Sequence, residues 1–309
     1  MSGVFASIAT MLEILPQIIW FSLLASAIYA LVAIGLSLIF GILEFINFAQ
    51  GDFAMVGAYL FFGFVIEGGL PWWIGIAMVV IVAALMGVVI ERITFKPVRK
   101  SPPFIPLVIS IGVGALLQAI MIFKFGGSVK SYRTEGSKAE VYKLFGDTLS
   151  VTQSQITLMF VTAGLLLGLY LFLKYSKTGT AIRAVADNQD VAAILGVSIN
   201  KTIGIIFAVG TALAAVAGVM IANEQNLSIT MGLSLGVKAF AAVVLGGVGS
   251  LPGAIVGAFI IGFSENFIVG LTPIPSSYKD AIVFGLLIIM LFLYPNGLFG
   301  AKAEEEARA

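Results

Sequence analysis

Long apolar runs separated by short polar segments make up most of the chain. A helix needs about 20 mainly apolar residues to cross the hydrocarbon core of a bilayer. Seven stretches come close to that length: residues 18–40, 45–66, 72–91, 104–123, 155–173, 202–222 and 281–299. The pattern therefore predicts an all-α polytopic membrane protein.

Two polar or glycine-rich segments interrupt the apolar pattern. NFAQGD at residues 47–52 follows one apolar piece, and LGGVGSLPG at 245–253 divides the stretch from about 234 to 270. Backbone that is not helical at membrane depth is tolerated only where protein or a wet cavity surrounds it. We predict broken helices near 41–53 and 245–253, and about 8–9 transmembrane or re-entrant helices in a single domain over residues 1–309.

A polar segment at residues 174–201 lies between two apolar runs and cannot itself lie in hydrocarbon. Residues 180–195 contain only good or tolerable helix formers. Arg183 and Asp187 are four residues apart, a spacing that lets the two side chains interact on a helix surface. Gly196 then favours a helix end. The segment predicts one or two short surface helices for a soluble partner; the alternative is a solvated loop without contacts.

The composition strengthens the membrane assignment and removes several chemistries. Hydrophobic residues make up 60% of the chain and charged residues 11%, with a mean hydropathy of +1.09, against about 25% charged residues in soluble domains. The chain has no Cys and no His, which excludes thiol catalysis, disulfides and zinc sites with nitrogen or sulfur ligands. A net charge of +1 without a basic aromatic cluster gives no reason to expect a nucleic-acid partner.

The distribution of Lys and Arg predicts the orientation. Ten of these residues lie in loop 91–103, in segment 174–201 and in the C-terminal tail, against five in loop 124–153. Lys and Arg concentrate in short cytoplasmic loops. We therefore expect segment 174–201 and the C-terminus in the cytoplasm, and loop 124–153 and the N-terminus outside.

Several polar side chains are expected at membrane depth, where a charge costs about 2.5–3.5 kcal/mol. They are Glu44, Asn47, Gln50 and Asp52 at the first break, and Lys238 and Glu265 around the second. These six are candidates for the lining of a translocation pathway. The alternative is that they cap or brace the ends of the broken helices.

Five stretches carry a resemblance to a known family. Asp190-Val191-Ala192-x-x-x-Gly196 resembles the acid-Ala-Ala-x-x-x-Gly core by which permeases of ABC importers engage their ATPases, although Val191 stands where the family has Ala. GLSLIFGILEFINFAQGDFAMVGAY, ERITFKPVRKS, KAFAAVVLGGVGSLPGAIVGAFIIGFSE and the pair YKDAIVF and YPNGLFG extend the match. The chain resembles the LivH-type permease of branched-chain amino acid ABC importers. Its first 16 residues and loop 124–153 lack the family wording.

The resemblance implies an assembly in the bacterial cytoplasmic (inner) membrane. The expected partners are a second homologous permease subunit, two cytoplasmic ATPase subunits, an extracytoplasmic solute-binding protein and membrane lipid. The chain has no G-x-x-x-x-G-K-S/T phosphate loop, so we expect no enzyme activity, cofactor or metal here, and ATP-Mg used by the partner ATPases. Segment 174–201 would be the coupling loop, with Arg183, Asp187, Asp190, Ala192 and Gly196 as its key residues.

The expected function is a permease subunit that moves branched-chain or other neutral amino acids into the cytoplasm. The same family includes permeases for urea, short amides and aromatic acids, so these solutes remain alternatives. An ion-coupled secondary transporter would use its own polar residues, such as those of 44–52, but would give segment 174–201 no purpose. A scaffold or membrane enzyme would not explain the broken helices.

Overall fold

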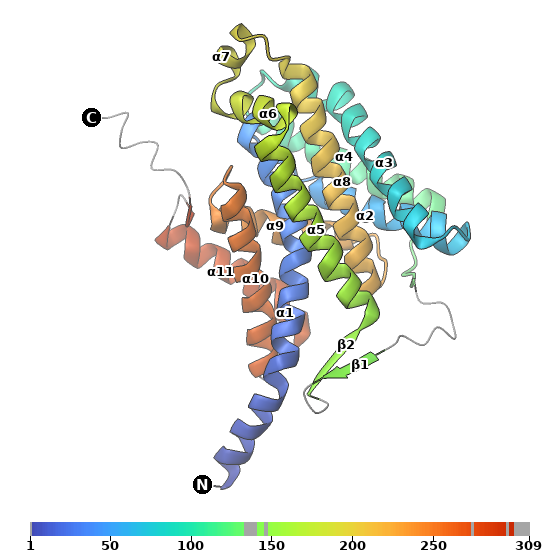
Figure 1. The fold of residues 1–309 in the computed structure, drawn as a ribbon, viewed down its shortest axis with the longest axis vertical. Helices are drawn as coiled ribbons and strands as arrows, with labels where there is room; N and C mark the ends of the chain where they lie inside the picture. Colours follow the sequence, from blue (N-terminus) through green and yellow to red (C-terminus); the bar gives the residue numbers. More distant parts are fainter. Residues whose placement is uncertain (1, 133–140, 145–147, 273–274, 295–296, 300–309) are drawn as a thin grey trace.

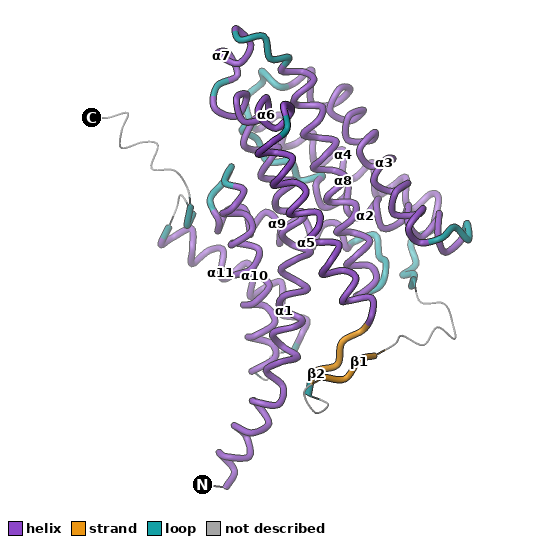
Figure 2. The backbone as a smooth tube through the Cα atoms, in the orientation of Figure 1, coloured by secondary structure: helices purple, strands orange, loops and turns teal. Residues whose placement is uncertain are grey.

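The computed structural model describes residues 2–132, 141–144, 148–272, 275–294 and 297–299, and most of this part is helical (Figure 1). The α-helices are α1 (Ser2–Leu43), α2 (Gln50–Phe61), α3 (Trp72–Ile90), α4 (Phe104–Phe125), α5 (Gln153–Tyr175), α6 (Lys177–Asp187), α7 (Gln189–Ile194), α8 (Ile199–Gln225), α9 (Met231–Gly246), α10 (Leu251–Leu271) and α11 (Lys279–Leu293). Short π or 3₁₀ turns extend several of them: η1 (Phe62–Glu67), η2 (Glu91–Phe95), η3 (Lys96–Val98) and η4 (Ser276–Tyr278). The strands β1 (Val141–Leu144) and β2 (Leu149–Thr152) pair as an antiparallel hairpin, which Figure 2 shows in orange.

Seven helical segments in the described part are long and apolar enough to cross a membrane. They are Ile14–Leu43, Trp72–Val98, Phe104–Phe125, Gln153–Tyr175, Ile199–Gln225, Leu251–Leu271 and Ser276–Leu293. Helices α2 and α9 are apolar but shorter, with 12 and 16 residues. The predicted all-α polytopic membrane fold is confirmed.

The helices α6 and α7 lie at one end of the molecule, and the β1–β2 hairpin and the start of α1 lie at the other (Figure 1). At the hairpin end, Gln17 Nε2 donates to the Ser150 carbonyl oxygen over 3.1 Å. At the α6–α7 end, Arg99 pairs with the buried Glu91 and donates to Asn200 Oδ1 over 3.0 Å. We call these two regions the hairpin end and the α6–α7 end.

The core lies where α1, α2, α8, α9 and α10 pack together. Tyr29, Phe53, Tyr59 and Phe207 are among its largest fully buried side chains. In the most apolar window of α1, 83% of residues are buried, against 6% in α5 and 6% in α11. Since α5 and α11 are apolar but exposed, their outer faces suit contact with lipid or another subunit.

The first break, between α1 and α2, is held by other helices. Glu44 has a φ of 55°, in the left-handed region, which ends α1. Phe48 N donates to Ser110 Oγ of α4 over 3.0 Å, and Asn47 Oδ1 accepts from Ala49 N over 3.2 Å. These two N–H groups of the non-helical backbone are therefore satisfied by protein, as membrane depth requires. The predicted break near 41–53 is confirmed.

The second break, between α9 and α10, is a tight glycine turn. Gly247 and Gly249 have φ values of 106° and 83°, which residues with a side chain rarely adopt. Ser250 Oγ caps α10 by accepting from Gly253 N over 3.2 Å. Backbone N–H groups of residues 298 and 299 donate to the carbonyl oxygens of Leu245 and Gly246, each over 2.9 Å. The predicted break at 245–253 is confirmed.

Helix α9 is a half-length element. Its 16 residues span about 24 Å at 1.5 Å per residue, less than the roughly 30 Å of the hydrocarbon core. Its first turn packs against the start of α2, where Gly232 lies beside Gly51 and Asp52. The N-terminus of α9, in the second interrupted segment, therefore lies next to the N-terminus of α2, in the first interrupted segment.

Candidate functional site

Three of the four polar residues predicted at the first break gather at the start of α2. Asn47 and Gln50 are each 1% exposed and Asp52 is 7% exposed. Gln50 Nε2 donates to the Gly210 carbonyl oxygen of α8 over 2.9 Å. Glu44 differs from the other three because its side chain is exposed. We call Asn47, Gln50 and Asp52 the first polar cluster.

Asp52 is enclosed by three helices. Gln118 Nε2 of α4 donates to Asp52 Oδ1 over 2.8 Å. Gly114 of α4 and Gly232 at the start of α9 lie so close to the carboxylate that a Cβ on either would crowd it. Glycine at these two positions thus makes room for a carboxylate that no Lys or Arg of the described residues neutralises. The sequence pattern predicts Asp52 but not Gln118, because nothing in the spacing of α4 distinguishes Gln118 from its neighbours.

Two polar atoms of the first cluster keep hydrogen-bonding capacity. Asn47 Nδ2 and Gln50 Oε1 are buried and have no partner among the described residues. A buried polar group without a partner costs about 1–3 kcal/mol. The cluster therefore holds a buried donor and a buried acceptor without partners among the described residues, next to the Asp52 carboxylate.

Lys238 and Glu265, predicted around the second break, form an ion pair between α9 and α10. Lys238 Nζ lies 3.0 Å from Glu265 Oε1, and Tyr29 OH of α1 donates to Glu265 Oε2 over 3.0 Å. Glu265 is 1% exposed and Lys238 is 8% exposed. Asp280 Oδ1, at the start of α11, lies 3.1 Å from Lys238 Nζ. We call Tyr29, Lys238, Glu265, Lys279 and Asp280 the second polar cluster.

Lys279, Asp280 and Tyr29 were missed by sequence analysis. Lys279 Nζ donates to Asn266 Oδ1 over 3.1 Å and lies 3.7 Å from Glu265 Oε1. The last span was predicted to begin at residue 281, so both charges at its start were assigned to a loop. The segment YKDAIVF, which belongs to the family resemblance, was a signal that could have found them.

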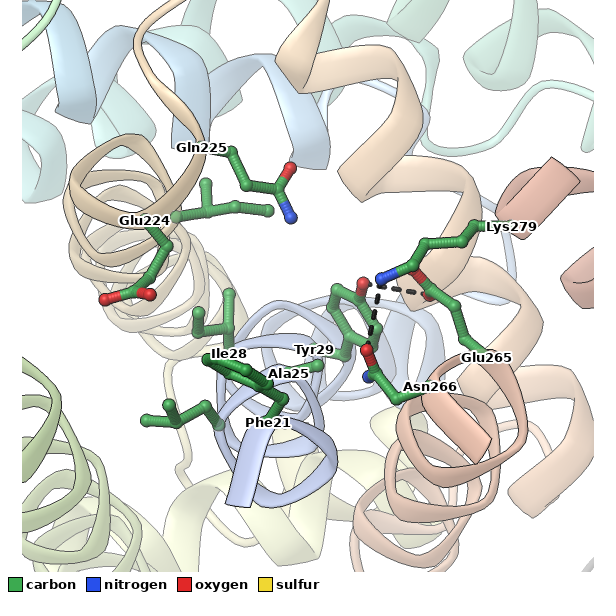
Figure 3. A pocket seen from close by; sticks show the side chains of 11 residues that line it. Phe21, Ala25, Ile28, Tyr29, Glu224, Gln225, Glu265, Asn266 and Lys279 are labelled. Carbon is green, nitrogen blue, oxygen red and sulfur yellow. Dashed lines mark hydrogen bonds and ion pairs between the residues drawn. The ribbon is translucent and has the colours of Figure 1, made fainter. Parts of the chain in front are cut away.

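A cavity of about 270 Å³ adjoins the second polar cluster. It lies between α1, α8, α10 and α11, with Lys279, Glu265 and Asn266 on one side and Glu224 and Gln225 on the other (Figure 3). Phe21, Ala25 and Ile28 of α1 lie between these polar sides (Figure 3).

The two polar clusters are separate but share α9. Gly232 packs on the first cluster, and Lys238 of the second lies six residues later on the same helix, about 9 Å along its axis. In the part of the chain that the structure describes, no hydrogen bond or ion pair joins the two clusters directly.

Segment 174–201 folds into two short helices. Ser176 Oγ caps α6 by accepting from Gly179 N over 2.8 Å, and Asn188 Oδ1 caps α7 by accepting from Asp190 N and Val191 N over 3.0 Å. Gly196 has a φ of 86° and ends the pair. The two N-cap residues explain why one helix-prone stretch breaks in the middle.

The five predicted coupling residues have different surroundings. Arg183 and Asp187 are exposed residues that line a cavity of about 460 Å³ beside the end of α1 and the α9–α10 turn. Arg183 bonds weakly to the Lys174 carbonyl oxygen and to Thr180 Oγ1, at 3.4–3.5 Å, rather than to Asp187. Asp190 is exposed, whereas Ala192 is buried and anchors α7.

Gln189 connects α7 to the first break, and sequence analysis missed it. Its Nε2 donates to the Ile42 carbonyl oxygen over 2.6 Å. Ile42 lies at the end of α1, two residues before Glu44 leaves the helical conformation. A movement of α7 can therefore act on the segment that leads into the first polar cluster.

Comparison with protein families gives a match over most of the chain. The family described as the permease component of the branched-chain amino acid transport system matches residues 18–291. LivH of Escherichia coli K12, a high-affinity branched-chain amino acid transport system permease protein, is 34% identical over 90% of this chain and 93% of its own length. BraD of Pseudomonas aeruginosa, which carries the same description, is also 34% identical with the same coverage.

More distant matches extend the similarity to other import systems and to a solved structure. The ribose import permease protein RbsC of Haemophilus influenzae is 27% identical over 95% of this chain and 87% of its own length. The structure of PsaBC from Streptococcus pneumoniae in complex with Fab superposes with a TM-score of 0.53, at 15% identity, over 91% of this chain and 94% of that chain. The structural match concerns the fold alone.

Proposed function

Since the chain belongs to the family of branched-chain amino acid transport permeases, we propose that it carries branched-chain or other neutral amino acids into the cytoplasm, powered by separate ATPase subunits. The chain is a multi-pass membrane permease of the ABC importer family. The proposed solute rests on LivH and BraD, each 34% identical to this chain and each named for branched-chain amino acids. The ribose permease matches at 27%, which makes a sugar the weaker candidate; urea, short amides and aromatic acids are further alternatives.

The surface of α6 and α7 carries the proposal for ATP-driven transport. Val191, Ile194 and Leu195 are large apolar residues at a polar end of the molecule, and Ile194 is 84% exposed. Neighbouring apolar residues exposed to water typically mark a protein contact. The Gln189 contact joins the same pair of helices to the end of α1. We infer that an ATPase docks on α6 and α7, and that this end is cytoplasmic.

The remaining proposed partners are the other subunits of such importers. A second homologous permease subunit would pair with this chain, and two ATPases would bind the α6–α7 ends of the pair. An extracytoplasmic solute-binding protein would deliver the solute at the hairpin end. ATP-Mg would be used by the ATPases, with no cofactor in this chain. We place the assembly in the bacterial inner membrane.

The first test is co-purification of the tagged chain from native membranes in mild detergent, followed by mass spectrometry. Recovery of a second permease together with ATPase subunits supports the proposal. A chain that is recovered alone, at full yield, favours an ion-coupled transporter instead. The co-purifying or neighbouring binding protein then identifies the solute by direct binding measurements.

The docking model also predicts that Gly196→Pro uncouples ATP hydrolysis from uptake. Gly196 has a φ of 86°, which proline cannot adopt because its ring holds φ near −65°. Asp190→Lys should have the same effect, since this exposed residue would change the charge of the docking surface. Membrane insertion should be unchanged in both variants. Normal uptake per ATP hydrolysed in both would contradict the docking model.

A further inference from the structure

We propose that the cavity between α1, α8, α10 and α11 is a binding subsite for a zwitterionic, apolar amino acid, with Lys279 facing its carboxylate and Glu224 facing its ammonium group. This inference rests on the proposed function, because it assumes that the permeant is an amino acid. It adds to the proposed function the location of a binding site and the side chains that recognise the solute.

The cavity has the size and the apolar wall that such a ligand needs. Its volume of about 270 Å³ lies just below the roughly 300–1,000 Å³ of sites for drug-sized molecules. Leu24 and Ile28 of α1 and Ile221 of α8 line it. An aliphatic side chain placed against them is removed from water, which is worth about 25 cal/mol per Å² of apolar surface.

The charges are on opposite sides of that wall. Lys279 reaches the cavity from the start of α11, and Glu224 reaches it from the last turn of α8 (Figure 3). An α-amino acid carries its ammonium group, its carboxylate and its side chain on the same carbon. A cavity with a cation, an anion and an aliphatic wall between them therefore matches all three parts of the ligand.

Both charged groups retain capacity for a ligand. The Lys279 ammonium has three N–H donors, and its contacts in the described residues are Asn266 Oδ1 at 3.1 Å and the longer one to Glu265 Oε1 at 3.7 Å. Glu224 accepts one hydrogen bond, from Gln155 Nε2 to Oε2 over 3.0 Å. The Gln155 contact holds the carboxylate in place and leaves Oε1 available among the described side chains.

The position of the cavity suits entry from outside. Glu224 is bonded to Gln155, which follows the β1–β2 hairpin by a few residues. On the inner side of the cavity, Glu265 contacts Lys238 of α9, the helix whose first turn packs on the first polar cluster. The cavity thus lies between Gln155, next to the hairpin, and the ion pair of Lys238 with Glu265.

The test uses the whole importer in proteoliposomes, with binding protein loaded with radiolabelled leucine. Lys279→Gln and Glu224→Gln should each lower leucine uptake at least tenfold, while binding-protein-stimulated ATP hydrolysis and the yield of complex are retained. The matched control is Glu67→Gln, an exposed carboxylate that pairs with Lys130 at 3.7 Å and does not line the cavity. Full leucine uptake by both cavity variants would overturn the proposal.

A second measurement uses the wild-type complex and needs no substitution of Lys279 or Glu224. A leucine analogue that carries a diazirine in its side chain should cross-link, in the wild-type complex, to peptides containing Leu24, Ile28 or Ile221. Excess leucine should prevent the labelling, whereas 4-methylpentanoate, which lacks the ammonium group, should not. Labelling confined to other peptides would overturn the subsite. A wild-type complex that imports no aliphatic amino acid would instead refute the proposed function, and the subsite with it.

Discussion

At the scale of single residues, the closest helix contacts depend on glycine where a side chain would collide with backbone. A Cβ on Gly218 of α8 would overlap with the Ala54 carbonyl group of α2, and one on Gly57 of α2 would overlap with Ala215 of α8. Small residues let helices approach closely in membranes, where packing replaces the hydrophobic effect as the driving force. The sequence shows many glycines but not which of them are in such contacts.

We therefore expect Gly218→Ala to destabilise the protein by about 1–3 kcal/mol, the usual cost of overpacking. Helix α8 would have to move away from α2, because the obstructing atoms belong to backbone. The measurement is the fraction that stays monodisperse in detergent after heating. Gly168→Ala in α5 is the matched control, since a Cβ there meets nothing within 4 Å. An equal loss of monodisperse protein in both variants would show that the close contact of α8 with α2 does not contribute to stability.

At the scale of elements, α7 and the end of α1 form one mechanical connection. Gln189 is the only residue of α7 whose side chain the described part of the structure shows bonded to α1. The bond ends on the backbone of Ile42, and α1 leaves the helical conformation at Glu44. A pull on α7 would therefore be transmitted to the break and, through it, to Asn47 and Asp52.

Loss of this bond should weaken coupling without preventing assembly. One hydrogen bond contributes about 1 kcal/mol, or roughly a factor of five in an equilibrium. We expect Gln189→Ala to lower leucine uptake per ATP hydrolysed by about that factor, with ATP hydrolysis itself retained. Lys177→Ala, which removes an exposed side chain of α6, is the control. An unchanged ratio of uptake to hydrolysis in Gln189→Ala would refute the connection.

At the scale of the whole molecule, the two ends carry different chemistry. The α6–α7 end combines capped surface helices with exposed apolar residues, and the hairpin end carries β1 and β2. Residues 298 and 299 hydrogen-bond to the end of α9, and the α9–α10 turn lines one cavity together with α6. The structure thus separates the start of α1 from α6 and α7, as the predicted orientation requires, but the side of the membrane on which each end lies remains a proposal.

Single-cysteine labelling tests the orientation directly, because the natural chain has no Cys. Val129→Cys should react with a membrane-impermeant maleimide in intact cells, since Val129 is 68% exposed in loop 124–153, which is predicted to lie outside. Lys100→Cys, in loop 91–103 that is predicted to be cytoplasmic, should react only after the membrane is opened, since Lys100 is exposed. The unmodified chain provides the background. The reverse pattern of labelling would invert the topology.

The sequence by itself determined that the protein lies in a membrane, that its fold is all-α, and where its helices break. Apolar length located six of the predicted spans, because a bilayer accepts only segments whose backbone is internally bonded. The predicted span at 45–66 is not among the seven membrane-length segments of the described part, which has the 12-residue α2 there. Asn47 and Gly249 indicated the breaks, because a polar side chain costs free energy in an apolar span and glycine permits non-helical backbone conformations. Asn47, Gln50, Asp52, Lys238 and Glu265 were all located in this way, and the structure shows each of them buried.

Only the tertiary structure decided which of these residues meet and what they meet. It placed Asp52 with Gln118 and Lys238 with Glu265, Asp280 and Tyr29, and it left Glu44 exposed. It also brought Gln189 to Ile42 across 147 positions and set Lys279 and Glu224 around one cavity. Such contacts depend on how rigid helices cross in space, and a local pattern of apolar and polar residues does not encode that geometry.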